Sequence, residues 1–188
     1  MNHSARTRAF PALAAAFALH LALGVVGVEA NEIDDPSLLL LPEPPHGFVV
    51  ERLPLLHEGK SLGFIVVLHK PGSGGRVTMQ AETNFDRTTR PARVAATKGY
   101  VNGVAEGLHK QGFKIAEKQI PDIEKADFSQ PVVVSITYAN DAGEKIYSRQ
   151  RLFFTQHGYN VNVLTSDPEE LELLSEWASR VRPYRAPN

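Results

Sequence analysis

The chain has 188 residues, of which 43% are hydrophobic and 22% are charged, and its formal net charge is −1 at pH 7. This balance excludes a protein that holds nucleic acid through an excess of basic charge. The absence of cysteine excludes disulfides and a lipid-bearing cysteine. A chain of this length can bury a core large enough to fold without cross-links.

Residues 1–30 have the pattern of an export signal. Arg6 and Arg8 precede an alanine-rich apolar run that ends in small residues, which is the order of a secretory signal peptide. We predict cleavage after Ala30, a periplasmic or secreted location, and no lasting membrane anchor. The alternative is an uncleaved anchor, because about 20 apolar residues can cross a bilayer; the alanines and His20 make the run weakly hydrophobic and favour cleavage.

Residues 31–46 are predicted to form an extended lead-in to a single domain, residues 47–188. The lead-in begins with acidic residues and ends in a proline-rich stretch that suits neither helix nor sheet. Between these parts lie four leucines, residues 38–41, which would expose a large apolar surface to water. We therefore expect the leucines to dock on the domain as a short strand. Contact with a partner is the alternative.

The first part of the domain is predicted to consist of strands. Residues 47–53 and the largely apolar run at 62–69 have strand length, and residues 76–83 alternate between apolar and polar side chains. A glycine-rich segment, residues 71–75, joins the last two strands as the tip of a hairpin. This tip does not continue into the Lys and Ser/Thr that end a phosphate-binding P-loop, and no helix is expected after it, so we expect a turn there and no phosphate site.

A helix is predicted over residues 91–111. Its apolar side chains recur with the helical period, a proline stands in its first turn, and a glycine follows its last turn. A strand at 113–120 is expected to follow. Three arginines at the start of the helix are expected to be solvated surface charges: Arg87, Arg90 and Arg93.

The last third of the chain predicts three antiparallel strands, residues 131–138, 145–155 and 159–165, connected as a meander. A helix from 167 to about 182 should close the domain, because its Asp-Pro-Glu-Glu start supplies a cap and acids for the helix dipole. The order of elements predicts an α+β fold, in which an antiparallel β-sheet with a C-terminal three-stranded meander is covered by two main helices.

This pattern resembles the PsbP-like sandwich, which includes DcrB-like exported bacterial proteins. The resemblance lies in the helix end at 108–113 (LHKQGF), in the meander, and in GYNV at 158–161 leading into the closing helix. It covers residues 47–183. The resemblance implies a binding or assembly accessory, usually without enzymatic activity. The chain departs from DcrB-like members because it has no lipid-bearing cysteine, so membrane tethering is not implied.

No motif for catalysis or metal binding stands out. No serine lies in a Gly-x-Ser-x-Gly elbow, and no HExxH sequence is present. Five histidines follow residue 30, and none pairs with another at helical ligand spacing: His46, His57, His69, His109 and His157. We therefore predict no cofactor, no metal site and no enzymatic activity. The alternative is a hydrolase or metal-dependent enzyme whose residues converge only in three dimensions.

The strand at 145–155 offers a candidate contact surface. Alternation places four of its side chains on one side, namely Tyr147, Arg149, Arg151 and Phe153. Tyr138 on the preceding strand is expected nearby. Aromatic residues and Arg are enriched at interface anchors, so we predict that these five side chains bind a partner. The alternative is a face that one of the protein's own helices covers, with arginines extending to water.

The sequence thus predicts an exported, non-enzymatic binding or accessory protein of the periplasm. It would recognise a protein partner and bind no nucleic acid, and one form of this role is an immunity protein that neutralises a toxin. A membrane-anchored envelope component is the other alternative, and it depends on the fate of residues 1–30. The identity of the partner and the oligomeric state stay open at this level.

Overall fold

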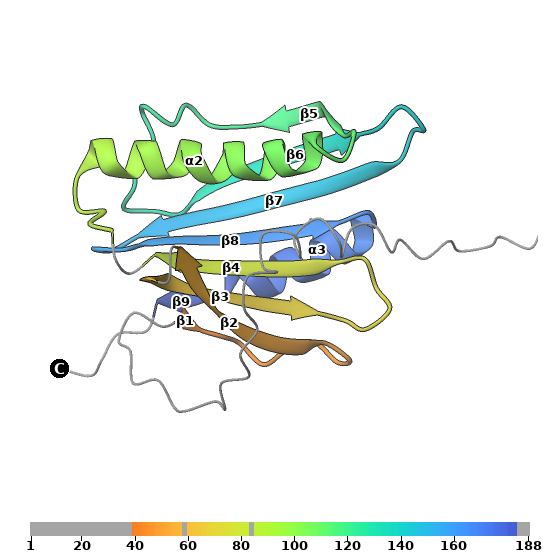
Figure 1. Ribbon diagram of the computed structural model, residues 1–188, viewed down its shortest axis with the longest axis horizontal. Coiled ribbons are helices and arrows are strands. Elements are labelled where there is room, and N and C mark those ends of the chain that lie inside the picture. The colour runs from red at the N-terminus through yellow and green to blue at the C-terminus, as the bar shows by residue number, and fades with distance from the viewer. Residues whose placement is uncertain (1–38, 58–59, 83–84, 184–188) are drawn as a thin grey trace, which may run out of the picture.

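The computed structural model describes residues 39–57, 60–82 and 85–183, and Figure 1 shows how they are arranged. The predicted export signal lies outside these residues. Within the described part, neither helix is both long enough and apolar enough to cross a membrane.

Seven strands form one antiparallel sheet in the order β2-β3-β4-β8-β7-β6-β5. They are β2 (Val49–His57), β3 (Lys60–His69), β4 (Arg76–Glu82), β5 (Lys114–Gln119), β6 (Val132–Ala139), β7 (Lys145–Phe154) and β8 (Gly158–Thr165). The predicted hairpin is β3-β4, and the predicted meander is β6-β7-β8. The α+β class with two helices is confirmed, and β8 joins the two halves of the sheet because it pairs with both β4 and β7.

Helix α2 (Arg90–His109) begins and ends close to its predicted limits. The hydroxyl of Thr89 accepts a hydrogen bond from the backbone N–H of Ala92 at 3.4 Å and so caps the first turn. At the other end Gly112 has φ = 86°, a left-handed conformation that suits glycine. The chain can then reverse into β5 because the turn places Phe113 back on the helix, where its N–H bonds to the carbonyl of Leu108.

Helix α3 (Pro168–Ser179) starts as its sequence predicts. The carboxylate of Asp167 accepts hydrogen bonds from the backbone N–H groups of Glu169 and Glu170, at 2.8 and 3.4 Å. The two glutamates also favour the positive end of the helix dipole. Cap and charge therefore fix the start of α3 from four consecutive residues.

The end of α3 is earlier than predicted, because the chain leaves it to form β9 (Arg182–Pro183). β9 pairs with β1 (Leu39–Leu40) in a separate two-stranded sheet. Leu39 is 7% exposed and belongs to the core under α3, and Leu41 packs against that core, whereas Leu40 is 52% exposed. The expected short strand is present, and Leu38 lies outside the described residues. The indole N–H of Trp177 donates to the carbonyl of Glu43 at 2.9 Å and holds the lead-in against α3 as well.

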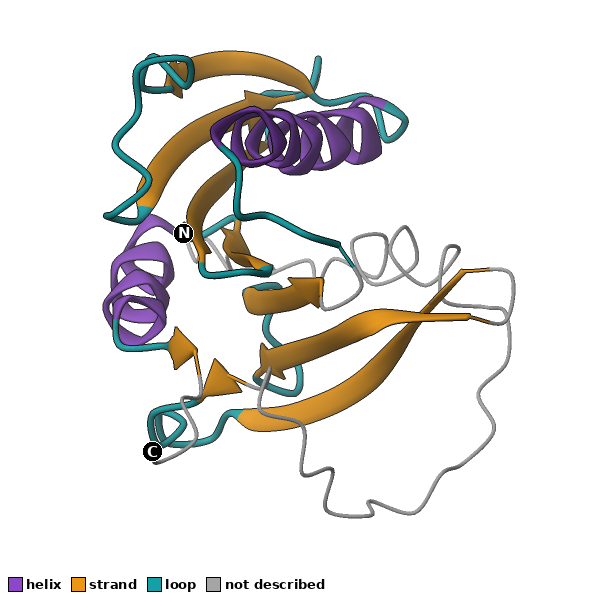
Figure 2. Cartoon of the chain, turned by 90° about the vertical axis from the view of Figure 1, so that its left-hand side faces the viewer, coloured by secondary structure: helices purple, strands orange, loops and turns teal. Residues whose placement is uncertain are grey.

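Two apolar cores lie on the two sides of the sheet. The core under α2 includes Leu108 and Leu152, and the core under α3 includes Leu174 and Trp177. Figure 2 shows the two helices on opposite sides of the strands. Alternation along a strand therefore sends one set of side chains to each core.

Each helix covers only part of its side of the sheet. α3 packs mainly against β8, β7 and β4. Val133 of β6, which points to the same side as α3, is 48% exposed. A strip of the sheet beside α3 is therefore accessible, and the candidate site lies along it.

Candidate functional site

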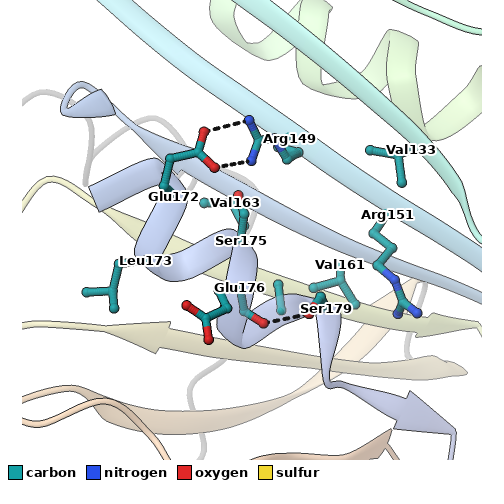
Figure 3. Close-up of a pocket in the computed structure, with 11 residues that line it drawn as sticks. Val133, Arg149, Arg151, Val161, Val163, Glu172, Leu173, Ser175, Glu176 and Ser179 are labelled. Atoms are coloured by element: carbon teal, nitrogen blue, oxygen red, sulfur yellow. Dashed lines mark hydrogen bonds and ion pairs between the residues drawn. The ribbon is translucent and has the colours of Figure 1, made fainter. Parts of the chain in front are cut away.

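A groove of about 510 Å³ lies between α3 and the strands beside it (Figure 3). Its lining comes from β6, β7, β8 and α3, and includes Val133, Arg149, Arg151, Val161, Glu172 and Leu173.

Strand register builds the floor of this groove. Arg149 pairs with Val163, and Arg151 pairs with Val161 on β8 and with Val133 on β6. These side chains all point to the α3 side, because paired residues of neighbouring strands share a face. The result is a floor in which two arginines stand among small apolar side chains.

Arg149 and Glu172 form an ion pair across the groove, drawn as two dashed lines in Figure 3. The two guanidinium N–H groups donate to the two carboxylate oxygens at 2.9 and 2.8 Å. This hydrogen bond raises the pKa of Arg149 and lowers the pKa of Glu172. Because the Glu172 side chain is 69% exposed, water screens the pair, and such a pair contributes about 0–1 kcal/mol to stability.

Arg151 is held differently. Its guanidinium donates to the carbonyl of Val181 at 3.2 Å and lies 5.0 Å from the centre of the Phe153 ring. Burial lowers the pKa of Arg151, and the neighbouring charge of Arg182 lowers it further. Within the described part of the chain no carboxylate pairs with Arg151. The groove therefore contains a partly buried positive charge without an acidic partner.

Four of the five predicted contact residues lie on one side of the sheet, as alternation predicts. Of these, Arg149 and Arg151 line the groove. Phe153 is only 9% exposed and stacks on Tyr159, with ring centres 5.1 Å apart, and Tyr147 packs against the same core. The arginines thus face the groove, whereas Phe153 is covered by the protein itself.

The placement of Tyr138 beside these residues was wrong. Tyr138 pairs with Ile146, and both belong to the core under α2, on the opposite side of the sheet. Its side chain is 1% exposed. The side chain of β6 that accompanies the arginines is Val133 instead.

Sequence reasoning missed the contribution of α3 to the site. Leu173 is 50% exposed although leucine is an apolar residue. Its helical position lies off the buried stripe of Leu171 and Leu174, and that offset was a readable signal for an exposed apolar side chain. No local sequence pattern predicts the ion pair between Glu172 and Arg149, because the two residues are 23 positions apart.

The groove lining includes the hydroxyl of Ser175, which is buried and has no hydrogen-bond partner among the described residues. No histidine stands in the same lining as a base for this hydroxyl. In the part of the chain that the structure describes, no three His, Cys, Asp or Glu side chains are grouped to hold a metal ion. The side chain of His57 lies outside that part.

The sequence matches no known family model and no curated protein. Among solved structures, the chain is similar to the solution structure of cyanobacterial PsbP (CyanoP) from Synechocystis sp. PCC 6803. The similarity covers 86% of this chain and 100% of that one, at 14% identity and a TM-score of 0.43.

The chain is also similar to the crystal structure of PA94, a protein of unknown function from Pseudomonas aeruginosa. This similarity covers 75% of this chain and 83% of that one, at 14% identity and a TM-score of 0.33. The likeness to PsbP-like proteins that the sequence suggested is thus found at the level of the fold alone.

Proposed function

We propose that this chain is an exported, non-enzymatic binding or accessory protein that recognises a protein partner through the groove beside α3. The observation that carries the proposal is the pair of exposed apolar side chains at this groove. Val133 is 48% exposed and Leu173 is 50% exposed, and both line the groove that contains Arg151. Arginine is enriched at interface hot spots, and apolar surface exposed beside it is typical of a binding site.

The shape of the uncovered strip suits a segment of another protein. Beside α3 lie β6 and the edge strand β5, whose residues are all exposed. Two strands at a spacing of about 4.8 Å span about 10 Å, which is the diameter of one helix with its side chains. A helix or an extended segment from a partner would bury Val133 and Leu173, and each Å² of apolar surface buried contributes roughly 25 cal/mol.

Charge supports the same conclusion. Arg149 is already paired with Glu172, whereas Arg151 has no carboxylate among its described neighbours. An Asp or Glu of the partner would form a charge-assisted hydrogen bond with Arg151. The proposed partner segment is therefore apolar with at least one acidic side chain.

The interaction is tested by selecting random displayed peptides on the purified domain. We expect enriched peptides to combine apolar and acidic residues, and to lose binding to Leu173→Asp by at least about tenfold. The matched control is Val49→Asp, because Val49 is also an exposed apolar residue, at 42%, but lies outside the groove. Peptides that bind the Leu173→Asp and Val133→Asp variants with the same affinity as the original protein would contradict the proposed site.

Export is the second part of the proposal, and the leader pattern of residues 1–30 supports it. The mass of the protein recovered from the periplasm should correspond to a chain that starts at Asn31. Recovery of the full-length chain from the membrane fraction would instead make the leader an anchor.

Neutralisation of a toxin is one form of the proposed recognition. It predicts that cells expressing this chain survive a toxin delivered to the periplasm, and that the Leu173→Asp variant protects them less. If that variant protects the cells as well as the original protein does, the groove is not the surface that neutralises the toxin.

A further inference from the structure

A second hollow, of about 500 Å³, lies at the C-terminal end of α2, on the opposite side of the sheet from the groove. Figure 1 shows α2 ending beside β5 and β6, and the rest of the lining comes from these two strands and from the turn after α2. The residues that matter for its chemistry are Phe113, Ile115, Tyr138, His109, Lys110 and Lys114.

The apolar part of the hollow is built by the turn after α2. Phe113 is 6% exposed and belongs to the core under α2, whereas Ile115 is 49% exposed. Ile115 pairs with Tyr138 on β6, so the two side chains are on the same face of the sheet, and the strand pairing is irregular just after Ile115. An isoleucine exposed to this degree beside a tyrosine presents apolar surface to a ligand.

Tyr138 contributes an unused polar group. Its hydroxyl is buried and has no hydrogen-bond partner in the described part of the chain, and an unsatisfied buried group costs about 1–3 kcal/mol. Burial also raises the pKa of Tyr138 to about 12. The hydroxyl therefore stays protonated at neutral pH. Because Tyr138 lines the hollow, this hydroxyl can donate to an acceptor that moves aside the side chains covering it.

The rim is basic, and one of its charges is free. Lys114 pairs with Asp141 at 3.1 Å. Lys110 forms no ion pair with the described residues, and its backbone N–H, rather than its side chain, bonds to the carbonyl of Glu106. His109 adds a second group that can carry positive charge, and Glu106 is the acid in the lining.

We propose that this hollow binds a small amphiphilic carboxylate. Its hydrocarbon part would lie over Phe113 and Ile115, and its carboxylate would accept the hydrogen bond of the Tyr138 hydroxyl within the field of Lys110 and His109. A carboxylate satisfies both the unpaired donor and the positive rim, which neither a hydrocarbon nor a cation does.

The test is a titration of the full domain with octanoate, octanol and octyltrimethylammonium, followed by calorimetry or by NMR shifts. Octanoate should bind at least about tenfold more tightly than octanol, and the cation should not bind. The Tyr138→Phe variant should lose about tenfold in affinity for octanoate and keep its affinity for octanol, while its melting temperature does not fall. Tyr147→Phe, on the other side of the sheet, is the matched control and should bind octanoate normally.

Three outcomes would overturn the proposal. One is an absence of octanoate binding, and another is equal binding of octanoate and octanol. The third is unchanged octanoate binding by Tyr138→Phe. Sedimentation with phosphatidylglycerol vesicles separates a free carboxylate from an anionic membrane surface, because a protein that binds the vesicles but not octanoate would contradict a site for a free carboxylate. The Leu173→Asp variant should bind octanoate like the original protein, because Leu173 lies outside the hollow. The proposals for the groove and for the hollow are therefore tested separately.

Discussion

Charged side chains are held in two different ways in this molecule. At the start of α2, the guanidinium of Arg93 donates to the carbonyls of Arg87 and Thr155, at 2.7 and 3.2 Å, and lies over the ring of Phe154. Beside α3, Arg151 donates to one carbonyl of the described residues, at 3.2 Å, and lines an accessible groove. The first arginine connects parts of its own fold, and the second has bonding capacity left for another molecule.

Glu170, like Arg93, connects separate parts of its own fold. Its carboxylate accepts hydrogen bonds from the hydroxyls of Ser73 and Thr165, at 2.6 and 2.7 Å. It thereby ties the tip of the β3-β4 hairpin to the first turn of α3. Glu172, two residues later, lies at the groove and pairs only with Arg149 among the described residues. Neighbouring acids on one helix thus serve the fold in one case and the groove in the other.

The largest expected effect is on Arg93. Replacement by Ala leaves two backbone carbonyls without their donor and exposes part of the Phe154 ring, so we expect a loss of about 3 kcal/mol in the free energy of unfolding. Urea denaturation measures it. Arg90→Ala is the control. Arg90 also lies over an aromatic ring, that of Phe128, but it is exposed and among the described residues donates to one carbonyl, that of Glu124; its loss should stay below about 1 kcal/mol. Equal losses of stability in Arg93→Ala and Arg90→Ala would contradict the view that Arg93 connects parts of the fold.

The next effect concerns Gly75, which packs against the Glu170 carboxylate. A Cβ added at Gly75 would overlap that carboxylate and push it from Ser73 and Thr165. We expect Gly75→Ala to lower the free energy of unfolding by about 2 kcal/mol, since hydrogen bonds to charged groups are worth about 1.5–3 kcal/mol each. Gly74→Ala is the matched control, because its Cβ would meet only Ser166, at 3.8 Å. A stable Gly75→Ala protein would show that Glu170 moves without cost.

The elements of the fold could be predicted because their signals are local. The cap at Asp167, the glycine after α2 and the alternation along β7 each lie within a few consecutive residues. The face on which Tyr138 lies could also have been predicted from the sequence. The turn between β6 and β7, which Asn140 closes by bonding to Glu144, sets Tyr138 opposite Ile146, and paired residues share a face.

The bonds of the arginines could not be predicted, because they depend on segments far apart in the chain. Thr155 is 62 positions from Arg93, and Glu172 is 23 positions from Arg149. The expectation that the arginines at the start of α2 are solvated was wrong for Arg93, which is part-buried, and for Arg87, whose side chain is 17% exposed and pairs with Glu82. Periodicity shows which face a residue takes, and only the packed fold shows what covers that face.

A smaller effect on stability and a larger one on binding are expected at Arg151. Replacement by Met keeps an unbranched apolar stem and removes the charged guanidinium, so the free energy of unfolding should change by less than about 1 kcal/mol. Binding of the selected acidic peptides should weaken by about tenfold. Parallel urea and binding titrations measure the two quantities. A loss of stability as large as that of Arg93→Ala would place Arg151 among the residues that hold the fold.

The smallest effect concerns the Arg149–Glu172 pair, and it depends on pH. The hydrogen bonds from Arg149 lower the folded pKa of Glu172 below its ordinary value of 4.5. The pair therefore stabilises the fold above that value, and its contribution disappears as the pH falls through the lowered pKa. At pH 7 the Glu172→Gln variant should lose at most about 0.5 kcal/mol, because exposed pairs are screened by water. In acid, below the lowered pKa, the two proteins should unfold at the same urea concentration. A difference that persists in acid would mean that Glu172 supports α3 through packing rather than charge, and the groove would then share the kind of bonding found at the start of α2.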